Sequence, residues 1–136
     1  MTQHRPPPET GTTLAPLVKP AFTRLHLASY AAASGDFNRL HLDLDYAREA
    51  GHPSLVAHGM LTMAYLGELV AHAAGDFGAV VRQLEVRFLG VAHEGDSITC
   101  RGRVSERVGP IVRFDIWAEK QDGEKIAAGT AEVAAA

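Results

Sequence analysis

The sequence is poor in cysteine, in long apolar runs and in charge of one sign. Its single cysteine, Cys100, excludes a disulfide within the chain and favours a cytoplasmic protein. Residues 1–20 lack the apolar run of a secretory signal, and no stretch is long enough to span a membrane. The net charge is −3, from 13 basic and 16 acidic side chains without a basic cluster. These features argue against a membrane protein and against a nucleic-acid binder.

What remains is the composition of an ordinary globular protein, with 46% apolar and 21% charged residues over 136 positions. That length fits one domain with a core of its own. Residues 1–11 are polar and rich in proline, which predicts a flexible leader or an arm laid on the surface. We therefore expect a leader over residues 1–11 and a single domain over residues 12–136.

The first half of the domain is predicted to hold three helices. Thr23 is a good N-cap for a helix over residues 24–33, with Leu25, Ala28 and Ala32 as its apolar face. A short helix over residues 43–50 lies within the long polar connection 34–57. The third helix, over residues 59–73, is apolar on nearly every face, which is typical of a buried helix.

The second half alternates apolar and polar residues, which predicts antiparallel strands from residue 79 onward. Gly109-Pro110 and Asp122-Gly123 supply hairpin turns, and a last strand is expected over residues 124–133. An earlier extended segment over residues 14–22 is limited by its prolines to a sheet edge. The predicted architecture is α+β, an antiparallel sheet wrapped around one long buried helix.

The polar connection carries residues suited to acid–base chemistry. Asp36 and His41 are five positions apart, so both side chains can turn toward one pocket, and a carboxylate with an imidazole can transfer protons near neutral pH. The connection leads to Gly59, whose backbone N–H at the start of the buried helix can stabilise a developing negative charge on a thioester oxygen. Each piece alone also has a structural explanation, because aspartate suits turns and a loop histidine often bonds backbone.

Two segments resemble the MaoC-like hydratases and dehydratases of the hotdog fold. The family motif reads approximately A-S-G-D-x-N-P-x-H-x-D, then a spacer and A-H-G-M-L. This chain matches it with Ala33, Ser34, Gly35, Asp36, Asn38, His41 and Asp43, followed by Ala57, His58, Gly59, Met60 and Leu61.

The resemblance implies a (3R)-hydroxyacyl-thioester dehydratase or (R)-specific enoyl-thioester hydratase of fatty-acid or polyketide metabolism. Asp36 and His41 would be the catalytic pair, and the Gly59 N–H would polarise the thioester carbonyl. His58 and Met60, the neighbours of Gly59, would belong with it to the substrate-binding residues. Of these, His58 is expected to bond backbone at the helix start. Asn38 and Ser34 would brace the loop.

The sequence departs from the family at two positions. Arg39 replaces the usual proline, so it is expected to loosen the loop or to reach the phosphate of the carrier. Gly67 stands where a related hydratase has a serine near the pocket.

Two other functions stay open. A thioesterase of this architecture would need a carboxylate in the buried helix, where Glu68 is the candidate, although it lies near the wrong end. The chain could also be the non-catalytic subunit of a heterodimeric dehydratase, although Asp36 and His41 argue against that. We expect no cofactor and no metal, because His41, Asp43 and His58 match no known ligand spacing.

The expected partners are an acyl-CoA or acyl-carrier-protein substrate and a second hotdog subunit, with a homodimer as the default because a sheet edge is left exposed. Nothing in the sequence indicates the acyl length or the direction of the reaction. Cys100 is interpreted as a small core residue, since nothing near it would lower the pKa of its thiol.

Overall fold

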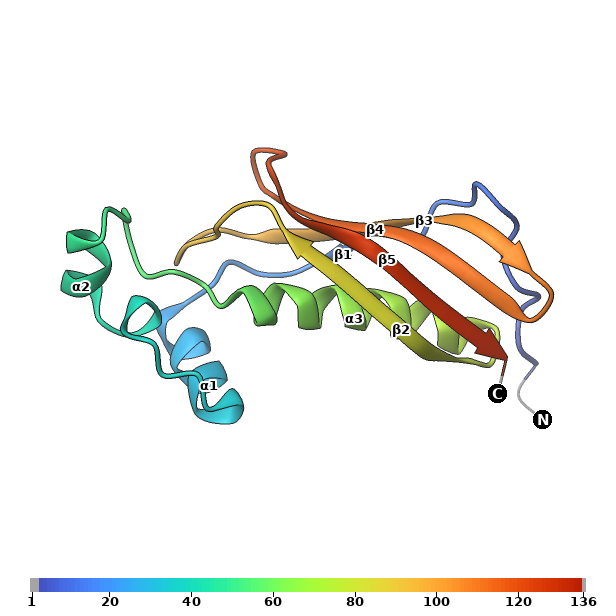
Figure 1. The fold of residues 1–136 in the computed structure, drawn as a ribbon, viewed down its shortest axis with the longest axis horizontal. Helices are drawn as coiled ribbons and strands as arrows, with labels where there is room; N and C mark the ends of the chain where they lie inside the picture. The colour runs from blue at the N-terminus through green and yellow to red at the C-terminus, as the bar shows by residue number, and fades with distance from the viewer. Residues whose placement is uncertain (1–2, 136) are drawn as a thin grey trace.

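The computed structural model describes residues 3–135. One long helix lies against a five-stranded antiparallel sheet, and three short helical segments gather beyond the N-terminal end of that helix (Figure 1). The elements are β1 (Leu17–Val18), α1 (Arg24–Ser34), the 3-10 turn η1 (Arg39–His41), α2 (Leu44–Glu49), α3 (Gly59–Asp76), β2 (Ala79–Phe88), β3 (Ile98–Val108), β4 (Ile111–Lys120) and β5 (Lys125–Ala135). The predicted α+β arrangement, a sheet around one buried helix, is confirmed.

Helix α1 has the predicted ends but buries a different face. The Thr23 hydroxyl accepts a hydrogen bond from the His26 N–H at 3.1 Å, and Gly35 closes the helix in the left-handed conformation. The residues that turn inward are Leu27 and Ala31, whereas Leu25 is 77% exposed. The predicted face of Leu25, Ala28 and Ala32 is therefore wrong. The helix is so rich in alanine that two faces have apolar residues at helical spacing, and tertiary packing selects between them.

Helix α3 is the centre of the core and runs three residues beyond the predicted end at Ala73. Its buried residues are Leu61, Thr62, Tyr65, Leu66, Leu69, Val70 and Ala74. The helix packs against β2, β3, β4 and β5, so one apolar cylinder is covered by the inner face of the curled sheet. None of the described helices has the length and apolar character needed to cross a membrane.

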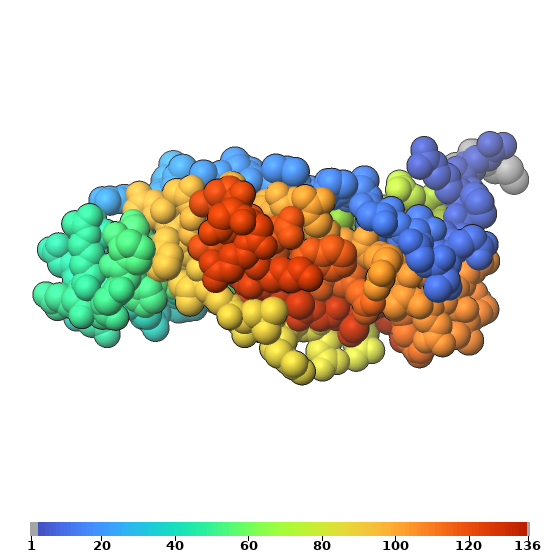
Figure 2. Space-filling model, turned by 90° about the horizontal axis from the view of Figure 1, so that it is seen from above, coloured from blue at the N-terminus to red at the C-terminus, as the bar shows by residue number. Residues whose placement is uncertain are grey.

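The strands follow the order β1-β3-β4-β5-β2, and every neighbouring pair is antiparallel. Tight turns at Gly109 and Gly123, both with positive φ, join β3 to β4 and β4 to β5. Strand β2 follows α3 directly but pairs across the sheet with β5, which leaves its other edge without a partner strand in the described chain. The outer face of the sheet has the N-terminal segment on one border and β2 on the other (Figure 2).

The segment before β1 lies along the surface. The Arg5 N–H donates to the Asp76 carbonyl at 2.9 Å, and the Gly11 N–H donates to the Val104 carbonyl at 2.8 Å. Strand β1 adds only two residues at the edge of β3, as its flanking prolines predict. The boundary at residue 12 and the flexibility of the leader stay predictions.

Candidate active site

His41 is the last residue of η1, and it is held there by the backbone of that turn and by the segment that leads to α3. The Asn38 side chain accepts a hydrogen bond from the Leu40 N–H, which starts this turn. The Nδ1 atom of His41 lies 2.6 Å from the Val56 carbonyl. Because a carbonyl only accepts, Nδ1 carries the proton and Nε2 presents a lone pair in the neutral ring.

Asp36 faces that lone pair. Its Oδ2 atom is 3.7 Å from His41 Nε2, and the Asp36 side chain is 49% exposed whereas that of His41 is 10% exposed. The Asp36 N–H donates to the Ser34 hydroxyl at 3.2 Å, and Asp36 Oδ1 accepts from the Asn38 N–H at the same distance. Ser34 and Asn38 thus fix the loop that places one carboxylate beside one imidazole.

His58 lies behind this pair and is almost completely buried. Its Nε2 atom is 3.1 Å from the Asp36 carbonyl oxygen, so His58 bonds the backbone of the loop. Its ring stacks on His41, with centroids 3.6 Å apart and planes 21° apart, and it packs against Tyr30 in a T-shaped arrangement with centroids 4.8 Å apart. Burial lowers the pKa of His58, partly opposed by the hydrogen bond to Asp36.

Gly59 begins α3, so its backbone N–H has no partner inside the helix. A Cβ at this position would lie 3.2 Å from the Phe88 ring, so the glycine makes room for an aromatic side chain from the end of β2. The next residue, Met60, is 55% exposed and does not line the cavity described below.

A cavity of about 220 Å³ is lined by His41 and Gly59, whereas Asp36 and His58 are not part of its lining. Thr62 and Phe88 contribute a hydroxyl and an aromatic ring to a mainly apolar wall. Sequence reasoning missed both as site residues, although Thr62 is one of the few polar residues in an otherwise apolar helix. The full lining is His41, Val56, Ala57, Gly59, Thr62, Phe88, Gly90, Val91, Ala92 and Ile126.

A known protein family matches most of the chain. The family model described as "MaoC like domain" matches residues 7–130. The chain belongs to the MaoC-like domain family. The resemblance predicted from the two sequence segments is confirmed.

The MaoC-like chain is similar to two solved hydratases. It is 29% identical to R-hydratase PhaJ1 from Pseudomonas aeruginosa, with a TM-score of 0.85, covering 93% of this chain and 81% of that one. The (R)-hydratase of A. caviae involved in PHA biosynthesis is 28% identical, with a TM-score of 0.85 and coverage of 94% and 97%. These matches confirm the hotdog fold.

Among curated proteins, the MaoC-like chain is similar to the fatty acid synthase beta subunit TOXC of Cochliobolus carbonum. The two are 30% identical over 107 residues, which is 77% of this chain and 5% of that protein. The chain thus spans a small part of the length of this relative.

Arg39, the departure from the family motif, is engaged locally. Its guanidinium bonds the Asp43 carboxylate at 2.9 Å and lies over the Tyr46 ring at 4.3 Å. Asp43 also caps α2 through the Tyr46 N–H, and these contacts lower the pKa of Asp43. In this conformation Arg39 joins the loop to the start of α2, while its effect on the flexibility of the loop and its contact with a carrier phosphate stay predictions.

The other candidate groups are placed away from the Asp36–His41 pair. Glu68 forms an ion pair with Lys19 at 3.0 Å. Gly67 packs against Leu84, where a Cβ would make an ordinary contact at 3.5 Å. Cys100 is buried in the core, and burial raises the pKa of its thiol to about 12, as expected for a core residue.

The cluster of Asp36, His41 and His58 has the composition of a metal site but not its geometry. Their possible ligand atoms lie within 4.8 Å of one another. However, the two imidazole rings are stacked almost parallel, and each nitrogen lone pair lies in the plane of its own ring. Two parallel planes do not meet at one ion about 2 Å from each nitrogen. The arrangement therefore favours proton transfer over metal binding.

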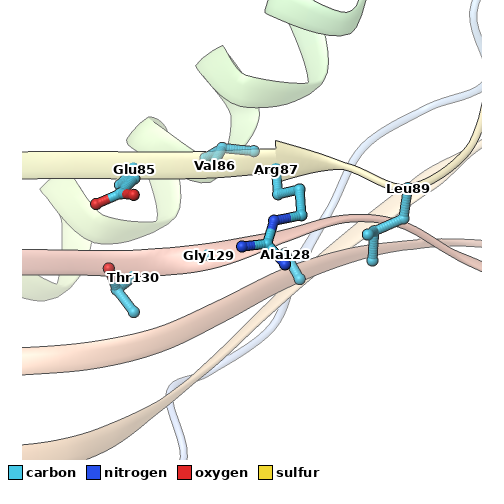
Figure 3. A pocket seen from close by; sticks show the side chains of 7 residues that line it. All are labelled: Glu85, Val86, Arg87, Leu89, Ala128, Gly129 and Thr130. Carbon is cyan, nitrogen blue, oxygen red and sulfur yellow. The ribbon is translucent and has the colours of Figure 1, made fainter.

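A larger hollow of about 530 Å³ lies where β2 runs beside β5 (Figure 3). Arg87 extends from β2 toward Ala128, and Glu85 and Thr130 lie further along the same strands. The hollow has a single cation and a single carboxylate and no histidine in its lining. The smaller cavity, which His41 lines, is therefore the better candidate for acid–base chemistry.

Proposed function

We propose that this MaoC-like chain is an (R)-specific enoyl-thioester hydratase and (3R)-hydroxyacyl-thioester dehydratase. One observation carries the proposal: the His41 Nε2 lone pair and the Asp36 carboxylate face one another 3.7 Å apart, and His41 lines an apolar cavity. Both groups accept hydrogen bonds, and a water molecule between them would donate one to each.

In the hydration direction, the oxygen of that water forms a bond to C3 of the enoyl thioester while His41 takes one of its protons. The electron pair of the C2–C3 double bond moves toward the thioester oxygen, where the Gly59 N–H stabilises the enolate. His41 then returns the proton to C2, so the reaction consumes one water and leaves both residues unchanged. Dehydration follows the same steps in reverse.

Asp36→Asn and His41→Ala test this assignment. The purified variants are assayed with trans-2-enoyl thioesters by the loss of absorbance of the conjugated thioester. Each variant is expected to lose about 10²–10⁴-fold in rate, the usual contribution of a general base. Asp45→Asn and His72→Ala, at exposed positions outside the site, are the matched controls. Near-normal rates in both site variants with circular dichroism unchanged would refute the assignment.

The substrate is proposed to be carried by coenzyme A or by acyl carrier protein. A panel of enoyl and (3R)-hydroxyacyl groups of several lengths, each on both carriers, shows which carrier the chain accepts.

The single cysteine, which is buried, is consistent with a cytoplasmic setting.

We further propose that the chain works as a homodimer. The free edge of β2 is ten residues long, and its neighbourhood exposes large apolar side chains. These are Val80, Val81, Phe88, Leu89 and Val91. Light scattering on the purified chain gives the stoichiometry. A monomer that gains activity only with a second hotdog subunit would establish the heterodimer instead.

The thioesterase alternative receives less support, because the Glu68 carboxylate is neutralised by Lys19 and does not line the cavity. Release of free thiol from saturated acyl thioesters, without hydration of enoyl ones, would establish it.

A further inference from the structure

His58 connects the two members of the proposed acid–base pair. It touches Asp36 through the hydrogen bond from Nε2 to the backbone carbonyl, and it touches His41 through the stacked ring faces. No other described residue makes both contacts. Since His58 precedes the first residue of α3, it also joins the loop to the most buried helix of the domain.

The contacts of His58 define its protonation state. The Asp36 carbonyl only accepts, so His58 carries its proton on Nε2. Its Nδ1 atom is buried and has no hydrogen-bond partner in the described chain. A second proton on Nδ1 would be a buried, unsatisfied donor on a charged ring, which is costly. His58 is therefore a neutral histidine of a single tautomer, and burial lowers its pKa accordingly.

The ring of His58 restrains His41 in a way that a hydrogen bond alone does not. The bond from His41 Nδ1 to the Val56 carbonyl fixes one point of the His41 ring. The stacked face of His58, which itself packs against Tyr30, restrains the plane of the His41 ring. Together they direct Nε2 toward Asp36, whose own peptide is held by the same histidine.

We propose that His58 is a positioning residue that holds the Asp36 peptide and the His41 ring plane as one rigid unit. The inference rests on the proposed hydratase function. In this role His58 makes no contact with substrate. It contributes a hydrogen bond to Asp36 and a stacking surface for the His41 ring.

Two substitutions divide these contributions. His58→Phe keeps a flat ring but removes the donor to Asp36, whereas His58→Gln keeps an N–H donor near the position of Nε2 but removes the ring. Each is expected to lower kcat by about 10- to 100-fold with KM changed less than about twofold, because small misplacements of catalytic groups have costs of this size. His72→Gln and His72→Phe, at an exposed position of α3, are the controls.

A double-mutant cycle distinguishes positioning from a general structural role. If His58 acts through Asp36, adding His58→Phe to Asp36→Asn should lower kcat far less than His58→Phe does in the parent chain. An equal loss in both backgrounds, or a loss that appears in KM rather than kcat, would overturn the proposal. Thermal melting of every variant shows whether it is folded at the assay temperature.

Nitrogen NMR of the unsubstituted protein provides a test that needs neither activity nor a foldable variant. The His58 imidazole should show one protonated nitrogen, Nε2, and one unprotonated nitrogen, Nδ1, at pH 7 and at pH 8. A doubly protonated ring at pH 7, or a proton on Nδ1 alone, would overturn the inference. If Asp36→Asn and His41→Ala leave hydration unchanged, the proposed function fails while this spectrum still reports the state of His58.

Discussion

Gly129→Ala should be among the alanine substitutions that lower the stability of this chain most, because the added Cβ would overlap with backbone atoms. A Cβ at Gly129 in β5 would lie 1.8 Å from the Glu85 carbonyl oxygen and 2.9 Å from the Val86 Cα atom of β2. Side-chain rotation cannot relieve these overlaps, so the two strands must separate by more than about 1 Å. Overpacking of this kind costs about 1–3 kcal/mol, and each ladder hydrogen bond lost adds about 1 kcal/mol. We expect a loss of at least about 3 kcal/mol.

Gly102→Ala is the matched control, since it makes the same change in another strand. Its Cβ would lie 2.9 Å from Leu14 Cδ1, the end of a flexible side chain, and 3.3 Å from Ile116 Cγ2. We expect a change of about 1 kcal/mol or less, because the leucine can move. Urea unfolding measures both variants, and with a slope of about 2 kcal/mol/M the Gly129→Ala midpoint should fall by about 1.5 M. Equal midpoints for the two variants would refute the reasoning.

Three further predictions concern ionisable groups. Glu68→Gln should leave enoyl hydration within about twofold of the parent chain, because Glu68 is paired with Lys19 outside the cavity; a loss above tenfold would contradict the assignment of the site. Cys100, buried and with its pKa raised to about 12, should resist a thiol reagent at pH 8 until urea unfolds the chain; rapid labelling of the native protein would show that the thiol is accessible. Burial lowers the pKa of His58 and of His93 in the folded chain below the ordinary value of 6.5. At pH values between the folded and the unfolded pKa, the unfolded chain therefore binds more protons than the folded chain. The free energy of unfolding should then fall as the pH drops below 6.5. Urea titrations at a series of pH values check the sign, and His58→Gln should flatten the slope; a stability that rises toward acid pH would disprove it.

Local signals in the sequence were sufficient for most of the fold. Thr23 and Gly35 mark the ends of α1 because capping depends on a few neighbouring atoms. The buried helix and the alternating strands follow from periodicity. The inward face of α1 did not follow, because the choice of Leu27 over Leu25 depends on contacts with distant segments.

The site was predictable in part for the same reason. Asp36 and His41 are close in sequence, so their meeting is a short-range property of one loop. The contact of Phe88 with Gly59 was not predictable in this way, since 29 positions separate the two residues and the contact depends on how β2 is placed. The stacking of His58 on His41 likewise depends on the path of the chain between η1 and α3, for which spacing gives no rule.

The position of β2 has a consequence for the growing polypeptide. The loop and α3 are complete by Asp76, but the only partner strand of β2 in the described chain begins at Lys125. Because synthesis proceeds at about 5–20 residues per second, β2 has no partner strand on either edge for seconds. The Phe88 side of the cavity cannot be held in place before β5 has left the ribosome. A nascent or C-terminally shortened chain would thus carry Asp36 and His41, the proposed acid–base pair, without the Phe88 side of the neighbouring cavity.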